Sequence, residues 1–166
     1  ALADRPALFL TLTYSDAYQV ADWSDWKRHV ERLFDRMQYR NSDISMIWRL
    51  ELIDRKSGEF KGELRPHLHC IIFNFPLVVD DKAPQPTIAD LSKPEENFGS
   101  TIYEFRRWLA QAWYEIVGTG DEKHLRAGTS AEVVRSWTAL KRYTSKYVAK
   151  ETDEIAGAPV PVGRWW

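Results

Sequence analysis

The sequence predicts an α+β domain in which helices pack against an antiparallel sheet. Two patterns support this class: short segments alternate with the two-residue period of strands, and longer segments repeat their apolar residues at helical spacing. These segments follow one another in the order β-α-β-β-α-β-α, without an internal repeat. A chain of 166 residues, 44% hydrophobic and 28% charged, has the size and balance of one domain with one core.

The first half of the chain predicts three strands and a helix. The first strand runs from Leu8 to Tyr14, where apolar and hydroxyl side chains alternate. A helix capped by Asp22 or Ser24 then extends to about Tyr39, because its apolar residues recur at helical spacing. Two further strands, Met46 to Ile53 and Pro66 to Phe75, are joined by a long hairpin connection. The last of these is apolar on both faces beyond its start, which is typical of a central strand.

The second half begins with an irregular loop, since residues 76–100 hold four of the eight prolines. A helix is expected from about Thr101 to just before Gly118, with an apolar inner face. A short strand from Thr129 to Val134 and a helix from about Thr138 to Glu151 follow. Residues 155–166 form a tail, which we expect to link the domain to a further C-terminal region.

Composition excludes several classes of protein. No apolar run approaches the roughly 18 residues of a membrane helix, and the N-terminus has no signal-peptide pattern, so we expect a soluble cytosolic protein. Cys70 is the only cysteine, which excludes an internal disulfide and a cysteine-cluster zinc site. The net charge of −1 is unusual for a protein that coats nucleic acid. Positive charge gathers near the C-terminus, at Arg135, Lys141, Arg142, Lys146 and Lys150.

His67 and His69 are separated by two residues in a predicted strand, so both imidazoles lie on the same face. Two convergent imidazoles are half of a metal site, although histidines at this spacing also occur as ordinary polar residues near strand ends.

Glu51 lies on the neighbouring strand, which the hairpin places beside the histidines. It shares a strand face with Arg49, so one explanation is an Arg49–Glu51 ion pair. The other is that Glu51 is a third ligand to a divalent cation. Two nitrogens and one carboxylate suit Mn²⁺ or Mg²⁺ in phosphoryl chemistry, and the ligand types also leave zinc open. Glu63 competes for the same role but falls in the expected turn.

Tyr143, Tyr147 and Lys150 share one stripe of the last predicted helix, since they are spaced by four and three residues. Tyrosine stripes are often part of a core. A separate stripe of the same helix is expected to supply the core here, which places the tyrosines on its flank. A nearby cation such as Lys150 lowers the pKa of a phenol and makes it a better nucleophile. The separate stripe consists of Trp137, Leu140, Thr144 and Val148.

Three segments together resemble the HUH endonuclease superfamily of replication initiators, relaxases and transposases. Residues 9–14, FLTLTY, are similar to its first motif; residues 65–73, RPHLHCIIF, to its second; and residues 143–150, YTSKYVAK, to the two-tyrosine form of its third. Each is weak alone, but their order and spacing together are specific. The two-tyrosine form is typical of rolling-circle initiators of small phages and prophage elements.

The resemblance implies a single nicking and joining domain built on a central five-stranded antiparallel sheet. It implies that His67, His69 and Glu51 hold Mn²⁺ or Mg²⁺ while a tyrosine cuts single-stranded DNA at an origin hairpin or loop, leaving a 5′-phosphotyrosine. Tyr147, the nearer to Lys150, is expected to act first. We expect a monomer in a bacterial cell or phage-infected host, with a host helicase as a candidate partner.

Two other functions remain open from the sequence. One is a relaxase or transposase of the same superfamily, and the other is a non-catalytic protein that stacks single-stranded DNA on sheet aromatics. A zinc hydrolase is disfavoured because the remaining histidines, His29 and His124, are far apart and are expected on a helix and in a loop.

Overall fold

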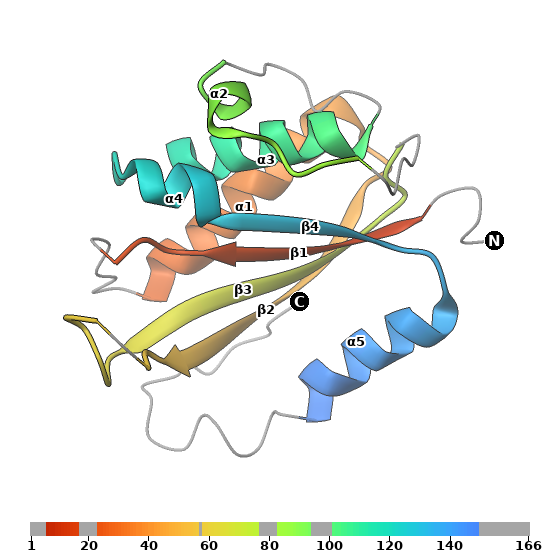
Figure 1. The fold of residues 1–166 in the computed structure, drawn as a ribbon. Coiled ribbons are helices and arrows are strands. Elements are labelled where there is room, and N and C mark those ends of the chain that lie inside the picture. The colour runs from red at the N-terminus through yellow and green to blue at the C-terminus, as the bar shows by residue number, and fades with distance from the viewer. Residues whose placement is uncertain (1–5, 17–22, 57, 77–82, 94–100, 150–166) are drawn as a thin grey trace.

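The computed structural model describes residues 6–16, 23–56, 58–76, 83–93 and 101–149. These residues form an α+β fold in which four helices cover one face of an antiparallel sheet and the last helix lies on the other face (Figure 1). None of the helices in these ranges is long and apolar enough to cross a membrane. The elements are β1 (Ala7–Thr13), α1 (Trp23–Arg40), β2 (Ser45–Asp54), β3 (Leu64–Phe73), α2 (Ile88–Leu91), α3 (Ile102–Val117), α4 (Glu122–Ala127), β4 (Thr129–Val134) and α5 (Trp137–Ala149).

The sheet has the strand order β2-β3-β1-β4, with every neighbouring pair antiparallel. The four strands predicted from residue patterns are therefore confirmed, and β3 is an inner strand as expected. The resemblance implied five strands, but the described residues form a sheet of four.

The two faces of the sheet differ because successive side chains of a strand point in opposite directions. Leu10 and Leu68 face the helices and are fully buried in the main core, together with residues of α1 and α3. The alternate positions, including Phe9 and His69, face α5. Sequence alternation thus separates a packing face from a face that carries polar groups within the same strands.

Helix α3 is held at both ends by local signals. At its N-terminus, Thr101 and Glu104 form a capping box, in which each side chain binds the backbone of the other residue. Gly118 ends the helix in the left-handed conformation, with φ of 71°. The predicted inner face is confirmed, since all six of its residues are buried: Phe105, Trp108, Leu109, Ala112, Trp113 and Ile116.

Two short helices were not expected. Helix α2 interrupts the proline-rich segment, where Thr87 and Asp90 form a second capping box. Helix α4 contains His124, which was expected in a loop. Six residues are too few to show a helical period, and the only buried one in α4 is a histidine, so no apolar stripe marks this helix.

The C-terminal end of β1 is anchored to the helical layer by hydrogen bonds. The carbonyl oxygen of Thr13 accepts from Trp113 Nε1 at 2.8 Å and from His124 Nε2 at 2.7 Å. One residue on, the Tyr14 hydroxyl is 3.0 Å from His29 Nδ1 within the core. These contacts fix the end of β1 that pairs with His67.

Candidate functional site

The α5 side of the sheet brings His67, His69 and Glu51 together. The sheet register pairs His67 with Glu51 on one side and with Thr13 on the other. The two imidazole centroids are 6.4 Å apart. The predicted common face of the histidines and the hairpin placement of Glu51 are therefore confirmed.

His69 connects Glu51 on β2 to Thr11 on β1. Its Nε2 lies 2.8 Å from a Glu51 carboxylate oxygen, and its Nδ1 lies 3.3 Å from the Thr11 hydroxyl. Both side chains of the His69–Glu51 pair are only 10% exposed. Because a carboxylate accepts, the neutral ring carries its proton on Nε2 and Nδ1 accepts from Thr11.

The position of Glu51 decides between the alternatives left by the sequence. Glu51 contacts His69, and no ion pair forms between the described side chains of Arg49 and Glu51. Glu63 is exposed in the turn before β3. Glu51 is therefore the acid that lies beside the histidines.

His67 is partly buried, and its pKa is lowered. Burial is the main cause, followed by the positive charges of Arg65 and His69, while Glu51 opposes the shift. A lowered pKa favours the neutral imidazole, the form that offers a lone pair to a cation.

The three side chains fit a divalent cation in the kind of donors they offer. As they stand, no three His, Cys, Asp or Glu side chains in the described ranges are arranged to hold a metal ion. The His69–Glu51 hydrogen bond joins two of the three candidate ligands directly. A cation bound here would therefore replace that hydrogen bond with two metal–ligand bonds.

Tyr143 is brought to this face by a stack of aromatic rings. Its ring lies on Phe9, with centroids 4.4 Å apart, and Phe9 lies nearly parallel to His69 at 5.7 Å. Helix α5 therefore contacts the strand next to the histidines.

The Tyr143 hydroxyl donates to Glu132 on β4 at 3.2 Å. Its pKa is raised, mainly by partial burial and then by the charge and hydrogen bond of Glu132. In this arrangement Tyr143 is a weaker nucleophile than an ordinary phenol at neutral pH.

The predicted packing of α5 was partly wrong. Leu140 is buried as expected, but Trp137 is 62% exposed and does not supply a core stripe. Tyr143 instead packs on this side of the sheet, because α5 meets only a short apolar patch there. That patch consists of Ala7, Phe9, Ile71, Val134 and Leu140.

Two predicted catalytic residues are not characterised by the structure. Tyr147 lies in α5, one helical turn after Tyr143, but its side chain is not described. Lys150 lies outside the described residues.

Sequence reasoning gave no role to Glu132, Phe9 or Thr11. Phe9 and Thr11 were part of a motif, and their positions on the α5 side follow from strand alternation. Glu132 carried no comparable signal, because an exposed acid on a short strand is ordinary.

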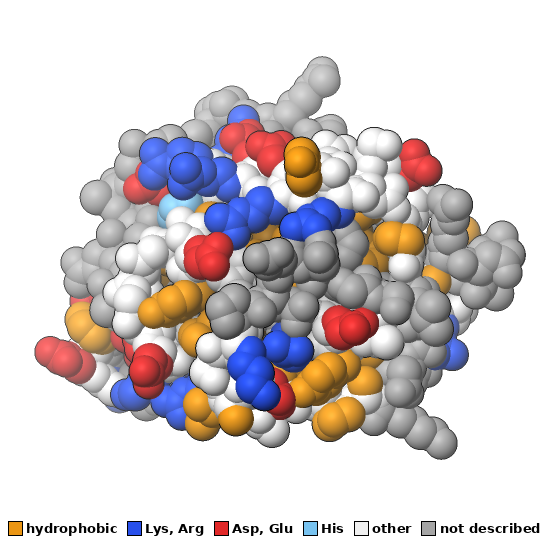
Figure 2. Space-filling model, turned by 90° about the horizontal axis from the view of Figure 1, so that it is seen from above, with side chains coloured by type: hydrophobic (Ala, Val, Ile, Leu, Met, Phe, Trp, Pro, Cys, Tyr) orange, Lys and Arg blue, Asp and Glu red, His pale blue; other side chains and the backbone are white. Residues whose placement is uncertain are grey.

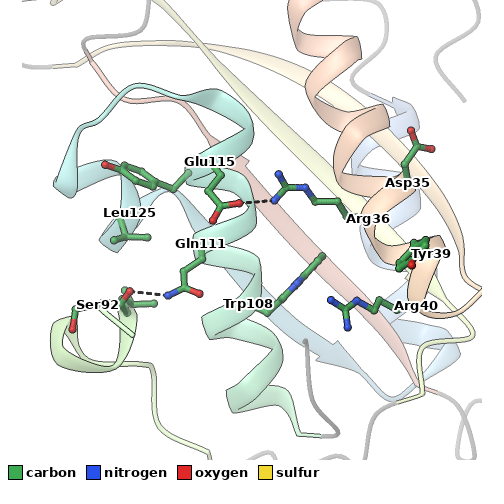
Figure 3. A pocket seen from close by; sticks show the side chains of 11 residues that line it. Asp35, Arg36, Tyr39, Arg40, Ser92, Trp108, Gln111, Glu115 and Leu125 are labelled. Atoms are coloured by element: carbon green, nitrogen blue, oxygen red, sulfur yellow. Dashed lines mark hydrogen bonds and ion pairs between the residues drawn. The ribbon is translucent and has the colours of Figure 1, made fainter. Parts of the chain in front are cut away.

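A separate pocket lies among the helices, away from this site (Figure 3). Arg36 on α1 and Glu115 on α3 form an ion pair at 2.8 Å in its lining, near Trp108. Because α1 and α3 cover the opposite face of the sheet from α5, this pocket does not belong to the histidine site (Figure 1).

Charge on the helical side is mixed. Seen from that side, basic and acidic side chains are interspersed over the described surface (Figure 2). Mixed charge of this kind is not the continuous basic band that tracks a phosphate backbone.

Comparison with known proteins identifies a family. A family model for the replication-associated protein ORF2/gene II protein matches residues 7–152. No curated protein and no solved structure matches the chain. The match spans β1, the histidine strand β3 and all of α5. This chain therefore belongs to the ORF2/gene II protein family of replication-associated phage proteins.

Proposed function

We propose that this chain initiates rolling-circle replication by nicking and rejoining single-stranded DNA through a 5′-phosphotyrosine intermediate. The observation that carries the proposal is the ring stack from Tyr143 through Phe9 to His69. It brings a helix with two tyrosines to the sheet face that holds two histidines and a buried carboxylate. Family membership in replication-associated proteins supports the same role.

In this proposal His67, His69 and Glu51 hold a divalent cation, either Mn²⁺ or Mg²⁺. The ion, when bound, supplies a positive charge that polarises a non-bridging oxygen of the scissile phosphate. The Thr11 hydroxyl, within hydrogen-bond distance of His69 Nδ1, orients that ring from the second strand.

The chemical step transfers one phosphate from sugar to protein and back. A tyrosine oxygen forms a bond to phosphorus and loses its proton, while the bond from phosphorus to the 3′-oxygen breaks and that oxygen takes up a proton. The number of phosphodiester bonds does not change, so rejoining by a 3′-hydroxyl needs no ATP.

We propose that Tyr147 makes the first cut and Tyr143 a later one. Glu132 and partial burial raise the pKa of Tyr143, which disfavours its ionised form before DNA binds. Lys150, one turn after Tyr147 in sequence, would favour ionisation of Tyr147. Glu132 would then accept the proton of Tyr143 when that residue attacks.

A denaturing gel tests the proposal. Wild-type protein incubated with a randomised single-stranded DNA library and Mn²⁺ should give a protein–DNA band that survives denaturation and disappears with EDTA. The Tyr143→Phe/Tyr147→Phe double variant should lack the band, while Tyr39→Phe, which alters an 89% exposed tyrosine on α1, should keep it. Cut DNA without a covalent band, or a band retained by the double variant, would overturn the proposal.

The same gel addresses the other functions. A relaxase or transposase would also form the adduct, and the sequences of the cut ends would separate these from an origin nickase. A non-catalytic binder would form none. The described sheet gives that last function little support, because Phe9 is covered by Tyr143 and is only 6% exposed.

A further inference from the structure

Arg49 is a charged residue on the proposed site face that the reaction described above does not use. It lies on β2, two residues before Glu51, and the sheet register pairs it with His69. Strand alternation therefore projects its side chain from the same face as His67, His69 and Glu51.

The Arg49 guanidinium has no counterion among the described residues. Its Nη1 is buried without a hydrogen-bond partner, and the nearby Glu51 carboxylate binds His69 instead. A buried unpaired cationic nitrogen costs free energy, so its presence calls for a physical reason.

The other arginines at this end of the hairpin differ from Arg49. Arg55 forms an ion pair with Asp16 at 2.9 Å. Arg65 donates to the Tyr14 carbonyl oxygen at 3.0 Å. Both are held by protein groups, which leaves Arg49 as the one of the three with an unengaged guanidinium.

We infer that Arg49 binds a backbone phosphate of the single-stranded DNA beside the proposed metal site. This inference rests on the proposed function. A guanidinium offers two parallel donors that match two phosphate oxygens, and a phosphate would also neutralise the charge. Such a contact concentrates positive charge where it is needed in a chain whose net charge is only −1.

The test measures DNA binding separately from cleavage. In the Tyr143→Phe/Tyr147→Phe background, Arg49→Gln should weaken binding of a randomised single-stranded oligonucleotide about tenfold at about 0.1 M salt, the typical effect of one charged hydrogen-bonded contact. The slope of log affinity against log salt concentration should shrink by about 0.7, the value for one phosphate on a single strand. Arg49→Lys should keep the slope but lose part of the affinity, because it keeps the charge and loses the planar fork.

Arg126→Gln is the matched control, since Arg126 is an exposed arginine on α4, across the sheet. It should bind DNA as the parent does. The Tm of Arg49→Gln should equal or exceed that of the parent, because no protein contact is lost. Equal binding and slope in Arg49→Gln and Arg126→Gln would overturn the inference, as would a loss of affinity that accompanies a large fall in Tm.

The outcome is separable from the proposed function. If the tyrosine-intact protein forms the covalent adduct while Arg49→Gln binds like the control, only the phosphate contact fails. If no adduct forms but Arg49→Gln weakens binding with the smaller slope, the phosphate contact stands and the nuclease proposal fails.

Discussion

At the scale of single residues, the candidate site depends on polar groups placed inside strands. His69 and Glu51 are each 10% exposed and bind each other, so neither is solvated as an isolated charge would be. Such a pair is costly to build into a sheet unless it contributes to stability or function, and its position beside His67 favours function.

Replacing His67 should weaken cation binding without unfolding the protein. His67→Ala removes one of three proposed ligands from a partly buried position, so we expect Mn²⁺ affinity to fall at least about tenfold by calorimetry. His124→Gln is the control, because His124 binds Thr13 on the helical side of the sheet. Unchanged Mn²⁺ affinity in His67→Ala would remove that residue from the proposed ligand set.

The two tyrosines should differ in rate. Tyr147→Phe should slow formation of the first covalent adduct at least about tenfold at neutral pH, whereas Tyr143→Phe should change it little, because the pKa of Tyr143 is raised. Single-turnover gels measure both rates. A Tyr147→Phe protein that forms the adduct at the wild-type rate would reverse the proposed order.

Residue placement could be predicted where strand alternation applied. The common face of His67 and His69 and the proximity of Glu51 follow from a two-residue period and a hairpin. The Glu132–Tyr143 hydrogen bond could not be predicted, because it depends on how α5 sits against β4, which no local pattern encodes.

At the scale of elements, the junction between α4 and β4 has little room. The Gly128 carbonyl oxygen accepts from the Thr13 backbone at 2.8 Å, and the Gly128 amide donates to the His124 carbonyl oxygen at 2.7 Å. A β-carbon at Gly128 would lie 2.6 Å from His124 Cδ2 and 2.8 Å from its Nε2, and would also clash with the His124 carbonyl oxygen.

Gly128→Ala should therefore destabilise the fold. We expect the free energy of unfolding to fall by about 1–3 kcal/mol, as for overpacking of a tight site, measured by urea titration. Ser130→Ala, at an exposed position two residues on, should change it by less than about 0.5 kcal/mol. A Gly128→Ala protein as stable as Ser130→Ala would mean that the junction yields without cost.

Long elements were predictable and short ones were not. Helices α1 and α3 carry apolar stripes, and the strands carry alternation or continuous apolar runs. Helix α4 is recognisable only by its Asp121 cap, and its buried residue is a histidine that serves the backbone of β1. The packing of α5 was predicted incorrectly because the exposed Trp137 resembles a core residue in sequence.

At the scale of the whole molecule, two buried histidines couple stability to pH. Burial is the main cause that lowers the pKa of His29 and of His124 below 6.5. Unfolding returns each pKa to about 6.5, so the unfolded chain binds more protons in mildly acidic solution. Their contribution to stability is therefore complete above about pH 6.5 and is lost as the pH falls through the lowered folded values.

Urea unfolding in EDTA should show a lower free energy of unfolding at about pH 5 than at about pH 7.5. His29→Gln/His124→Gln should show a smaller fall over the same interval, because two titrating groups are absent. A wild-type stability that is constant or rises as the pH is lowered would contradict neutral burial of these residues.

The whole fold places the chemistry on one side of the sheet and most of the core on the other. Most of that division was predictable, because the strands alternate and the helices have apolar faces. The number of strands implied by resemblance exceeded the four that are described, since the implied count came from the superfamily and not from residue patterns in this chain.

The central claim is that α5 delivers a tyrosine to a phosphate held at His67, His69 and Glu51. Mass spectrometry of the nuclease-trimmed, Mn²⁺-dependent adduct tests it most directly. We predict a nucleotide linked through its 5′-phosphate to Tyr147 in the wild-type protein and to Tyr143 in Tyr147→Phe. A nucleotide on any other residue, or no linked nucleotide although DNA is cut, would contradict it.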